Sequence, residues 1–118
     1  MSDPDHTLKI VTAALADLKG IEVEVLDVAK LTTITDAMVI VSGRSSRHVK
    51  SLADAVLTQA KAAGVEVIGS EGEQEGDWIL IDLAYVIVHI MQPRTRDFYK
   101  LEKLWGMHDR DEQAGRST

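Results

Sequence analysis

Residues 78–91 read WILIDLAYVIVHIM. This stretch contains two runs rich in β-branched and aromatic residues, which is typical of β-strands. Only Leu83 and Ala84 separate the two runs, and this spacing predicts a β-hairpin with a two-residue turn. In that register, Asp82 lies opposite Tyr85 in an antiparallel pair.

The predicted hairpin has two chemically different faces, because successive residues of a strand point to opposite sides of the sheet. One face carries only β-branched side chains, which suits packing against helices. The other face is apolar but also carries ring side chains, and it consists of Trp78, Leu80, Tyr85, Ile87, His89 and Met91. Two interpretations of this second face stay open. Either the C-terminal helix covers it, with Phe98 or Trp105 against Trp78, or it is a protein interface that Trp78 anchors.

Outside the hairpin, the apolar pattern predicts further strands and helices. Residues 37–41 are apolar at every position, which predicts a central strand buried on both faces. Residues 21–28 alternate between apolar and polar side chains and predict a strand with one solvated face, and residues 65–68 predict a short third strand. Helical spacing covers the start of the chain and the segment after Ser45, and Pro93 opens a last helical segment. The order predicts an α/β or α+β fold, with a mixed five-stranded sheet packed with helices.

Length, charge and composition limit the class of protein. A chain of 118 residues fits one domain, which we expect over residues 1–106, with a polar tail over 107–118. The absence of cysteine excludes disulfides and Cys-ligated zinc. We expect a cytoplasmic protein, because the chain has no apolar run of roughly 18 residues and no signal-peptide pattern. The net charge of −6, with five acids and no base in a predicted loop at 66–77, suits a basic protein partner better than nucleic acid.

No pattern in the chain indicates catalysis. A phosphoryl-transfer site needs carboxylates that converge on Mg²⁺, and no Asp-x-Asp pair lies on a predicted strand. The four histidines are dispersed, without metal-binding spacing. Residues 42–47 precede a helix and carry two arginines, which could hold an anion, although an ordinary capped helix is the favoured interpretation. We predict no enzyme, no cofactor and no metal, and we keep a nucleotide-binding module at 42–47 as an alternative.

The C-terminal half resembles one protein family closely. The strings WILID, VIVHI and RDFYKLEKLW, at residues 78–82, 86–90 and 96–105, match that family's pattern W-x-L-L-D, V-V-H and R-x-F-Y-x-L-E-x-L-W. The last string is long and improbable by composition, so the match is specific. The chain is therefore similar to the Iojap or ribosomal silencing factor family (RsfS) over about residues 5–106.

The resemblance implies a nucleotidyltransferase-type fold that lacks the catalytic carboxylates. It further implies binding to the large ribosomal subunit through its basic ribosomal protein fourteen, so that the small subunit cannot join and translation is repressed when nutrients are scarce. Trp78 and Leu80 match family residues that contact this ribosomal protein. Organellar relatives suggest an alternative role as a large-subunit assembly factor that uses the same face.

Three further expectations concern partners and local departures from the family pattern. An exposed apolar face or sheet edge predicts a homodimer when the protein is free. Peripheral contact with rRNA could involve a set of basic residues, although a solvated helix face is favoured: Arg44, Arg47, Lys50 and Lys61. The chain has Ala37-Met38 where the family usually has an aromatic pair, Ala84-Tyr85 where it has Gly-Asp, and Met91 where it has Phe.

Overall fold

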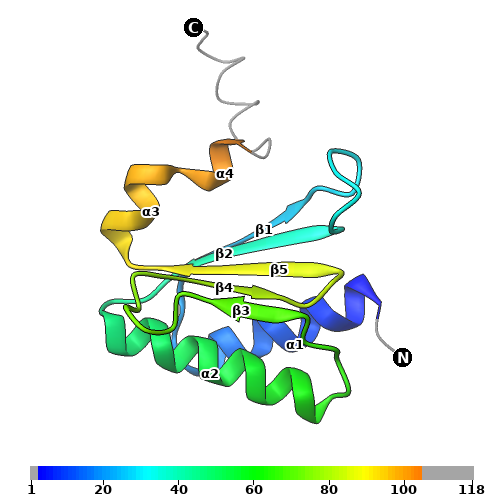
Figure 1. The fold of residues 1–118 in the computed structure, drawn as a ribbon, viewed down its shortest axis with the longest axis horizontal. Coiled ribbons are helices and arrows are strands. Elements are labelled where there is room, and N and C mark those ends of the chain that lie inside the picture. The colour runs from blue at the N-terminus through cyan, green and yellow to red at the C-terminus, as the bar shows by residue number, and fades with distance from the viewer. Residues whose placement is uncertain (1–2, 105–118) are drawn as a thin grey trace, which may run out of the picture.

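The structure, a computed structural model, describes residues 3–104. Its elements in chain order are α1 (Pro4–Asp17), β1 (Ile21–Asp27), β2 (Ala37–Ser42), α2 (Ser46–Ala62), β3 (Gly69–Glu71), β4 (Trp78–Asp82), β5 (Val86–Met91), α3 (Pro93–Tyr99) and α4 (Leu101–Leu104). Figure 1 shows α1 and α2 on one side of the sheet and α3 and α4 on the other. The predicted order of elements is confirmed, with the last helix divided in two. Trp105 and the predicted tail at 107–118 lie outside the described residues.

The sheet has five strands in the order β1-β2-β5-β4-β3. Strands β2 and β5 pair in parallel, and the other neighbours pair antiparallel. Every residue of β2 is buried. This agrees with the prediction of a strand covered on both faces, because β2 lies inside the sheet with helices on either side.

Side-chain caps determine where the two long helices begin. The Asp3 carboxylate accepts a hydrogen bond of 2.7 Å from the backbone N–H of His6, and Pro4 opens α1. At the start of α2, the Ser45 hydroxyl accepts the backbone N–H of His48 at 3.2 Å. Each cap satisfies an N–H group that has no partner within its own helix. The favoured interpretation of residues 42–47, a capped helix start, is confirmed.

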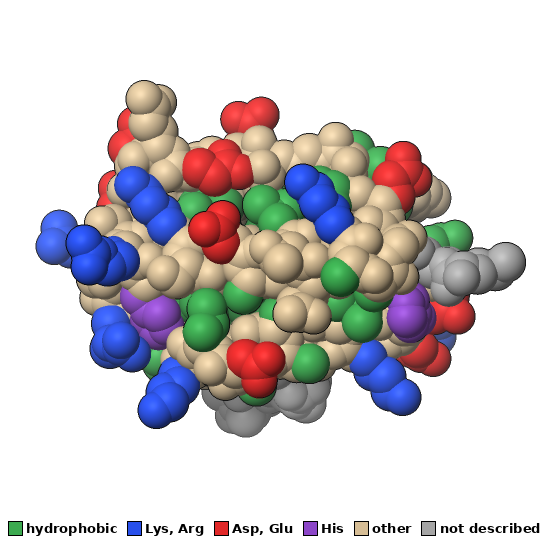
Figure 2. All heavy atoms as spheres, turned by 90° about the horizontal axis from the view of Figure 1, so that it is seen from below, with side chains coloured by type: hydrophobic (Ala, Val, Ile, Leu, Met, Phe, Trp, Pro, Cys, Tyr) green, Lys and Arg blue, Asp and Glu red, His purple; other side chains and the backbone are tan. Residues whose placement is uncertain are grey.

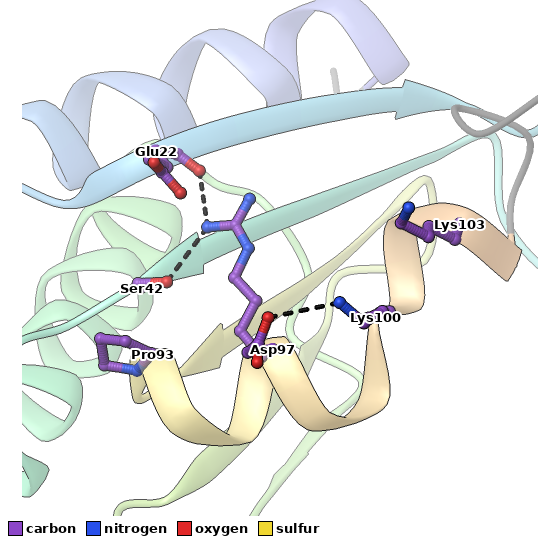
Figure 3. Close-up of a pocket in the computed structure, with 7 residues that line it drawn as sticks. Glu22, Ser42, Pro93, Asp97, Lys100 and Lys103 are labelled. Carbon is purple, nitrogen blue, oxygen red and sulfur yellow. Dashed lines mark hydrogen bonds and ion pairs between the residues drawn. The ribbon is translucent and has the colours of Figure 1, made fainter. Parts of the chain in front are cut away.

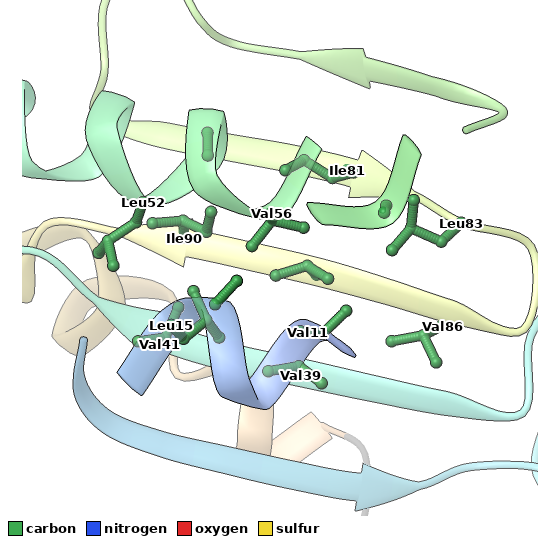
Figure 4. Close-up of a cluster of buried hydrophobic side chains, with 14 of the residues drawn as sticks. Val11, Leu15, Val39, Val41, Leu52, Val56, Ile81, Leu83, Val86 and Ile90 are labelled. Carbon is green, nitrogen blue, oxygen red and sulfur yellow. The ribbon is translucent and has the colours of Figure 1, made fainter. Parts of the chain in front are cut away.

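The main hydrophobic core lies between the sheet and the two long helices, as Figure 4 shows. The β-branched face of the hairpin supplies much of it, because all five of its side chains are fully buried there: Ile79, Ile81, Val86, Val88 and Ile90. Helix residues from one side of each helix pack on them, including Val11, Leu15, Leu52 and Val56. The sequence prediction that this face packs against helices is therefore confirmed.

The predicted position of the hairpin turn, at Leu83 and Ala84, is wrong. Asp82 lies opposite Ile87, and Trp78 lies opposite Met91. The turn lies one residue later than predicted, because the backbone N–H of Leu83 donates to the carbonyl of Val86 at 2.9 Å and leaves Ala84 and Tyr85 between the strands. The carbonyl oxygen of Tyr85 accepts the backbone N–H groups of Asp36 and Ala37, both at 3.0 Å. These two bonds connect the turn to the start of β2. The register moves by two residues, so the side chains of β4 and β5 keep their predicted faces, whereas Tyr85 lies in the turn.

The strand predicted at residues 65–68 is also wrong. Strand β3 covers Gly69–Glu71 and lies inside the segment predicted as an acidic loop. Val65 is buried in the core, but its backbone N–H donates to the carbonyl of Ala60 in the last turn of α2 and not to a neighbouring strand. Ile68 donates its backbone N–H to the carbonyl of Asp82 at 2.8 Å, and the ladder with β4 begins at Gly69, opposite Asp82. An apolar residue near a helix end therefore produced the same signal as a short strand.

Strand β1 lies at the sheet edge and buries different residues from those its alternation suggests. Val23 and Val25 are 38% and 46% exposed, whereas Leu26 is buried. The register shifts between Ile21 and Glu24, so the period-two pattern is broken inside the strand. The two long helices pack over the central strands, which leaves this edge incompletely covered.

A candidate protein-binding face

The side of the sheet opposite α1 and α2 carries the residues predicted to bind a partner, and we call this side the Trp78 face. The pairing of β2, β5 and β4 arranges its side chains in three cross-strand rows. These rows are Met38–Ile87–Asp82, Ile40–His89–Leu80 and Ser42–Met91–Trp78. The structure therefore brings five of the six predicted site residues onto one surface, and Tyr85 lies in the adjoining turn.

Helices α3 and α4 cover one end of the Trp78 face. The ring centroid of Tyr99 lies 4.9 Å from that of Trp78, and Leu101 packs against the small core that includes Met91. Met91 is fully buried as a result. Covering by the C-terminal helix, one of the two sequence interpretations, therefore holds for this end. The residue that rests on Trp78 is Tyr99, whereas Phe98 is 76% exposed.

A hydrogen bond between Trp78 and His89 orients the indole ring. The indole Nε1–H donates to His89 Nδ1 at 3.0 Å, so this nitrogen carries no proton. His89 is only 6% exposed. Its burial lowers the pKa of the imidazole to about 4, because the charged form loses its hydration. His89 is therefore neutral near pH 7 and acts as a hydrogen-bond acceptor that positions Trp78.

The middle of the Trp78 face remains partly open to solvent. Trp78, Leu80 and Ile87 are half-buried, although β4 and β5 lie inside the sheet. Tyr85, in the turn between these strands, is 41% exposed. These four side chains are accessible to a partner, while His89 and Met91 support them from below.

Sequence reasoning did not predict the exposure of two apolar side chains beside the Trp78 face, Ile34 and Phe98. Ile34, in the loop between β1 and β2, is 75% exposed and lines a hollow together with Tyr85. Phe98 contacts Tyr99 edge to face, with centroids 4.9 Å apart, and continues the aromatic surface beyond Trp78. Nothing local in the sequence distinguishes these residues from buried ones, because their exposure depends on where α3 and the loop lie.

Acidic side chains border the Trp78 face. Glu71 of strand β3 lies opposite Leu80, and it is exposed. The turn that follows adds Glu73, Glu75 and Asp77, which are also exposed. An apolar surface with a negative border is suited to a partner whose surface is basic.

Arg96 connects α3 to the far end of the sheet. Figure 3 shows the hollow at this end, with Glu22, Ser42 and Lys100 in its lining. Nη1 of Arg96 donates to the carbonyl of Glu22 at 2.7 Å and to the hydroxyl of Ser42 at 3.1 Å. The side chain is 6% exposed and lines a hollow of about 170 Å³ with Lys100 and Lys103. These bonds connect α3 to β1 and β2, so Arg96 positions the helix whose Tyr99 covers Trp78.

The described residues give little support for an anion site at 42–47, for a metal site or for a membrane-spanning helix. At residues 42–47 the backbone N–H of Arg44 donates to Nδ1 of His48 at 2.8 Å, so this donor is already used within the protein. Within residues 3–104, no group of three or more His, Asp or Glu could hold a metal ion. None of the helices in the described part of the chain is long and apolar enough to cross a membrane.

Comparison with known proteins gives a consistent result. A family model described as "Ribosomal silencing factor during starvation" matches residues 1–117. A ribosomal silencing factor RsfS from Chromobacterium violaceum is 45% identical over 98 residues, which cover 83% of this chain and 80% of that protein. A namesake from Bacillus subtilis is 36% identical over 99 residues, 84% of each chain.

Two further similarities concern an organellar protein and a solved structure. A mouse protein named "Mitochondrial assembly of ribosomal large subunit protein 1" is 34% identical over 82 residues, which cover 67% of this chain and 36% of that protein. The crystal structure of a protein from Chromobacterium violaceum superposes with a TM-score of 0.87 at 42% identity, covering 89% of this chain and 88% of that one.

Proposed function

The chain belongs to the ribosomal silencing factor family, and we propose that it binds the large ribosomal subunit through ribosomal protein fourteen and thereby blocks joining of the small subunit. The Trp78 face makes this contact through Trp78, Leu80, Tyr85 and Ile87. His89 and Met91 contribute from beneath, by holding Trp78 and the strand surface in place. Repression of translation then needs no chemistry, because a protein bound at the joining surface excludes the other subunit by its volume.

One observation carries the proposal: apolar side chains on interior strands of the sheet are accessible to solvent. Leu80 and Ile87 lie on β4 and β5, and no described helix seals them in the way that α1 and α2 seal the opposite face. Trp and Tyr, which flank these two aliphatic residues, are enriched among the residues that dominate binding energy in protein interfaces. This surface gains free energy by being covered.

Charge supports a basic partner for the Trp78 face. The chain has a formal net charge of −6, and exposed Glu71, Glu73 and Glu75 lie beside the face. Opposite charges around an interface raise the association rate and disfavour wrong partners. The proposed binding should therefore weaken as the salt concentration rises.

The first test is co-sedimentation of the purified protein with isolated large subunits, small subunits and joined ribosomes. We expect recovery with free large subunits only. Leu80→Ala should weaken that recovery about ten-fold, which corresponds to about 1.4 kcal/mol of an interface contact. Leu18→Ala is the matched control, because it removes the same atoms from a 39% exposed leucine at the end of α1.

Three results would contradict the proposal. Wild-type protein could fail to sediment with any particle, it could sediment equally with small subunits, or Leu80→Ala could bind as tightly as Leu18→Ala. Circular dichroism of each variant separates a binding defect from unfolding. Adding wild-type protein to separated subunits should also reduce the joined peak in a sucrose gradient.

An assembly role is the second candidate function. The name of the mouse relative, which concerns assembly of the mitochondrial ribosomal large subunit, favours it. Both roles use the same face, so binding alone does not separate them. Loss of an assembly factor should produce immature large subunits in growing cells, whereas loss of a silencing factor should change subunit joining only under starvation.

Two partner predictions remain for the free protein and for rRNA. The Trp78 face could pair two copies when no ribosome is present, and Leu80→Ala should then shift the protein towards monomer in equilibrium sedimentation.

Arg44, Arg47 and Lys50 are exposed at the beginning of α2. Figure 2 views this helix-covered side, where several Lys and Arg side chains gather at the left end and others lie further to the right. Contact of these residues with rRNA remains a prediction, and a solvated helix face is still favoured.

A further inference from the structure

A groove opens on the side of the sheet opposite the Trp78 face. It lies between the first turns of α1 and the adjoining ends of β1 and β2, and its volume is about 410 Å³. This size lies within the range of pockets that hold small ligands or single side chains. The groove is lined by Pro4, Asp5, Leu8, Val25, Asp27, Ala29, Asp36 and Ala37.

The groove exists because α1 does not cover the edge of the sheet. Val25 pairs with Val39, which belongs to the main core, so Val25 faces the same helix-covered side. Yet Val25 is 46% exposed, while Val39 is fully buried. Helix α1 packs on α2 and the central strands, and only its first turns reach the space beneath β1. The edge strand is thus left with an apolar surface that lacks a partner within the described residues.

The lining combines an apolar floor with three carboxylates. Leu8, Val25 and Ala37 contribute aliphatic surface, and Asp5, Asp27 and Asp36 contribute negative charge. No Lys, Arg or His is among the described residues that line the groove. A Lys or Arg side chain has the complementary chemistry, because its methylene stem can pack on apolar surface while its charged end contacts carboxylates.

We propose that this groove binds an Arg or Lys side chain presented by a basic polypeptide. The proposal goes beyond the proposed function, because the groove and the Trp78 face lie on opposite sides of the sheet and cannot contact one flat surface together. The occupant is therefore a basic protein other than the partner of the Trp78 face. Binding at the groove should depend on the carboxylates as well as on the apolar floor.

The test is an NMR titration of the ¹⁵N-labelled full chain with the peptide acetyl-Ala-Arg-Val-Arg-Ala-amide. We expect saturable shifts of the backbone amides of Leu8, Val25 and Ala29. The peptide acetyl-Ala-Gln-Val-Gln-Ala-amide should produce no such shifts, because it lacks the charged ends. The double variant Asp5→Asn with Asp27→Asn should bind the arginine peptide about five-fold or more weakly, the loss expected when exposed ion pairs are removed.

A matched charge control separates a specific groove from general attraction. Asp54→Asn with Glu66→Gln removes two exposed carboxylates outside the groove and should leave the affinity within about two-fold of wild type. Asn at position 27 keeps the oxygen that accepts the Ala29 N–H, so the local turn is retained. Equal weakening by both double variants would overturn the proposal, as would peptide shifts confined to residues 71–77 or to the Trp78 face. Because the probe is a peptide, this result is independent of whether the protein binds ribosomes.

Discussion

Trp78 makes two contacts within the protein and keeps one edge accessible to a partner. Its indole donates to His89, its ring lies 4.9 Å from that of Tyr99, and its half-buried edge is accessible to a partner. Trp78→Ala should therefore weaken large-subunit binding by about 2–4 kcal/mol, the range of a central interface anchor. Trp78→Phe keeps an aromatic ring beside Tyr99 but removes the N–H donor, so it should lose less.

Co-sedimentation measures the affinity of both Trp78 variants, and urea unfolding measures their stability. Because Tyr99 and His89 contact Trp78 within the protein, Trp78→Ala should also lower the free energy of unfolding by about 1–3 kcal/mol. The interface role of Trp78 fails if a folded Trp78→Ala protein binds large subunits as tightly as wild type does.

His89 should make the stability of the protein depend on pH. Its pKa is about 4 in the folded protein, against 6.5 for an exposed histidine. Between these values the unfolded chain takes up a proton and the folded chain does not, so lowering the pH through this window favours unfolding. The stability that neutral His89 contributes is fully present above about pH 6.5, and its loss is complete below about pH 4.

The expected loss follows from the size of the shift. One pKa unit corresponds to about 1.4 kcal/mol, so the free energy of unfolding should fall by up to about 3 kcal/mol across the window. Urea unfolding at pH 7 and pH 5 measures this slope in wild type and in His89→Gln. Carboxylates contribute equally to both proteins, so His89→Gln should show the smaller pH dependence. Equal slopes would contradict the assignment.

The hairpin between β4 and β5 contains a strained turn residue. Ala84 has φ +69°, and the Tyr85 N–H bonds the carbonyl of Leu83 to close a γ-turn around it. A side chain in this region of backbone space costs free energy that glycine avoids. Ala84→Gly should therefore raise the free energy of unfolding by about 0.5–1 kcal/mol.

Thermal or urea unfolding of Ala84→Gly tests the strained turn. Ala13→Gly is the matched control, because Ala13 is exposed inside α1, where glycine should cost about 1 kcal/mol. If both variants are destabilised to the same extent, the left-handed backbone at Ala84 is not a source of strain.

The elements also differ in how well sequence patterns predict them. The alternation in the two strands of the hairpin placed every side chain on its correct face, because a register change of two residues preserves the face. The pairing itself was mispredicted, because the turn lies at Ala84 and Tyr85, where Ala84 adopts a positive φ without the Gly or Asn that usually marks such a turn. The short strand β3 was misplaced because its partner β4 determines where pairing starts.

At the scale of the whole molecule, neither the net charge of −6 nor the start of α2 favours nucleotide binding at residues 42–47. Ser45 and His48 already accept backbone N–H groups at the start of α2, so fewer donors remain for phosphate. Millimolar ATP or GTP with Mg²⁺ should therefore produce no shift in melting temperature. Differential scanning fluorimetry checks this, because a ligand that binds the folded state stabilises it in proportion to RT ln(1 + [L]/Kd).

A nucleotide-dependent rise in melting temperature that Arg44→Ala and Arg47→Ala abolish would restore the alternative of a nucleotide-binding module. Both arginines are exposed, so their removal should not unfold the protein. Arg96→Ala is unsuitable as a control, because this buried side chain connects α3 to the sheet.

The sequence by itself determined the mixed fold, the order of its elements, the buried β-branched face and the family. These features depend on local periodicity and on long motifs, which the residues carry without reference to distant parts of the chain. The tertiary structure alone decided how far the Trp78 face is open. Tyr99 covers one end, Met91 is sealed, and Leu80 and Ile87 remain accessible, because the bonds of Arg96 place α3 over only part of the sheet. The groove beside Val25 has the same origin, since the packing of α1 against α2 determines which part of the edge strand stays uncovered.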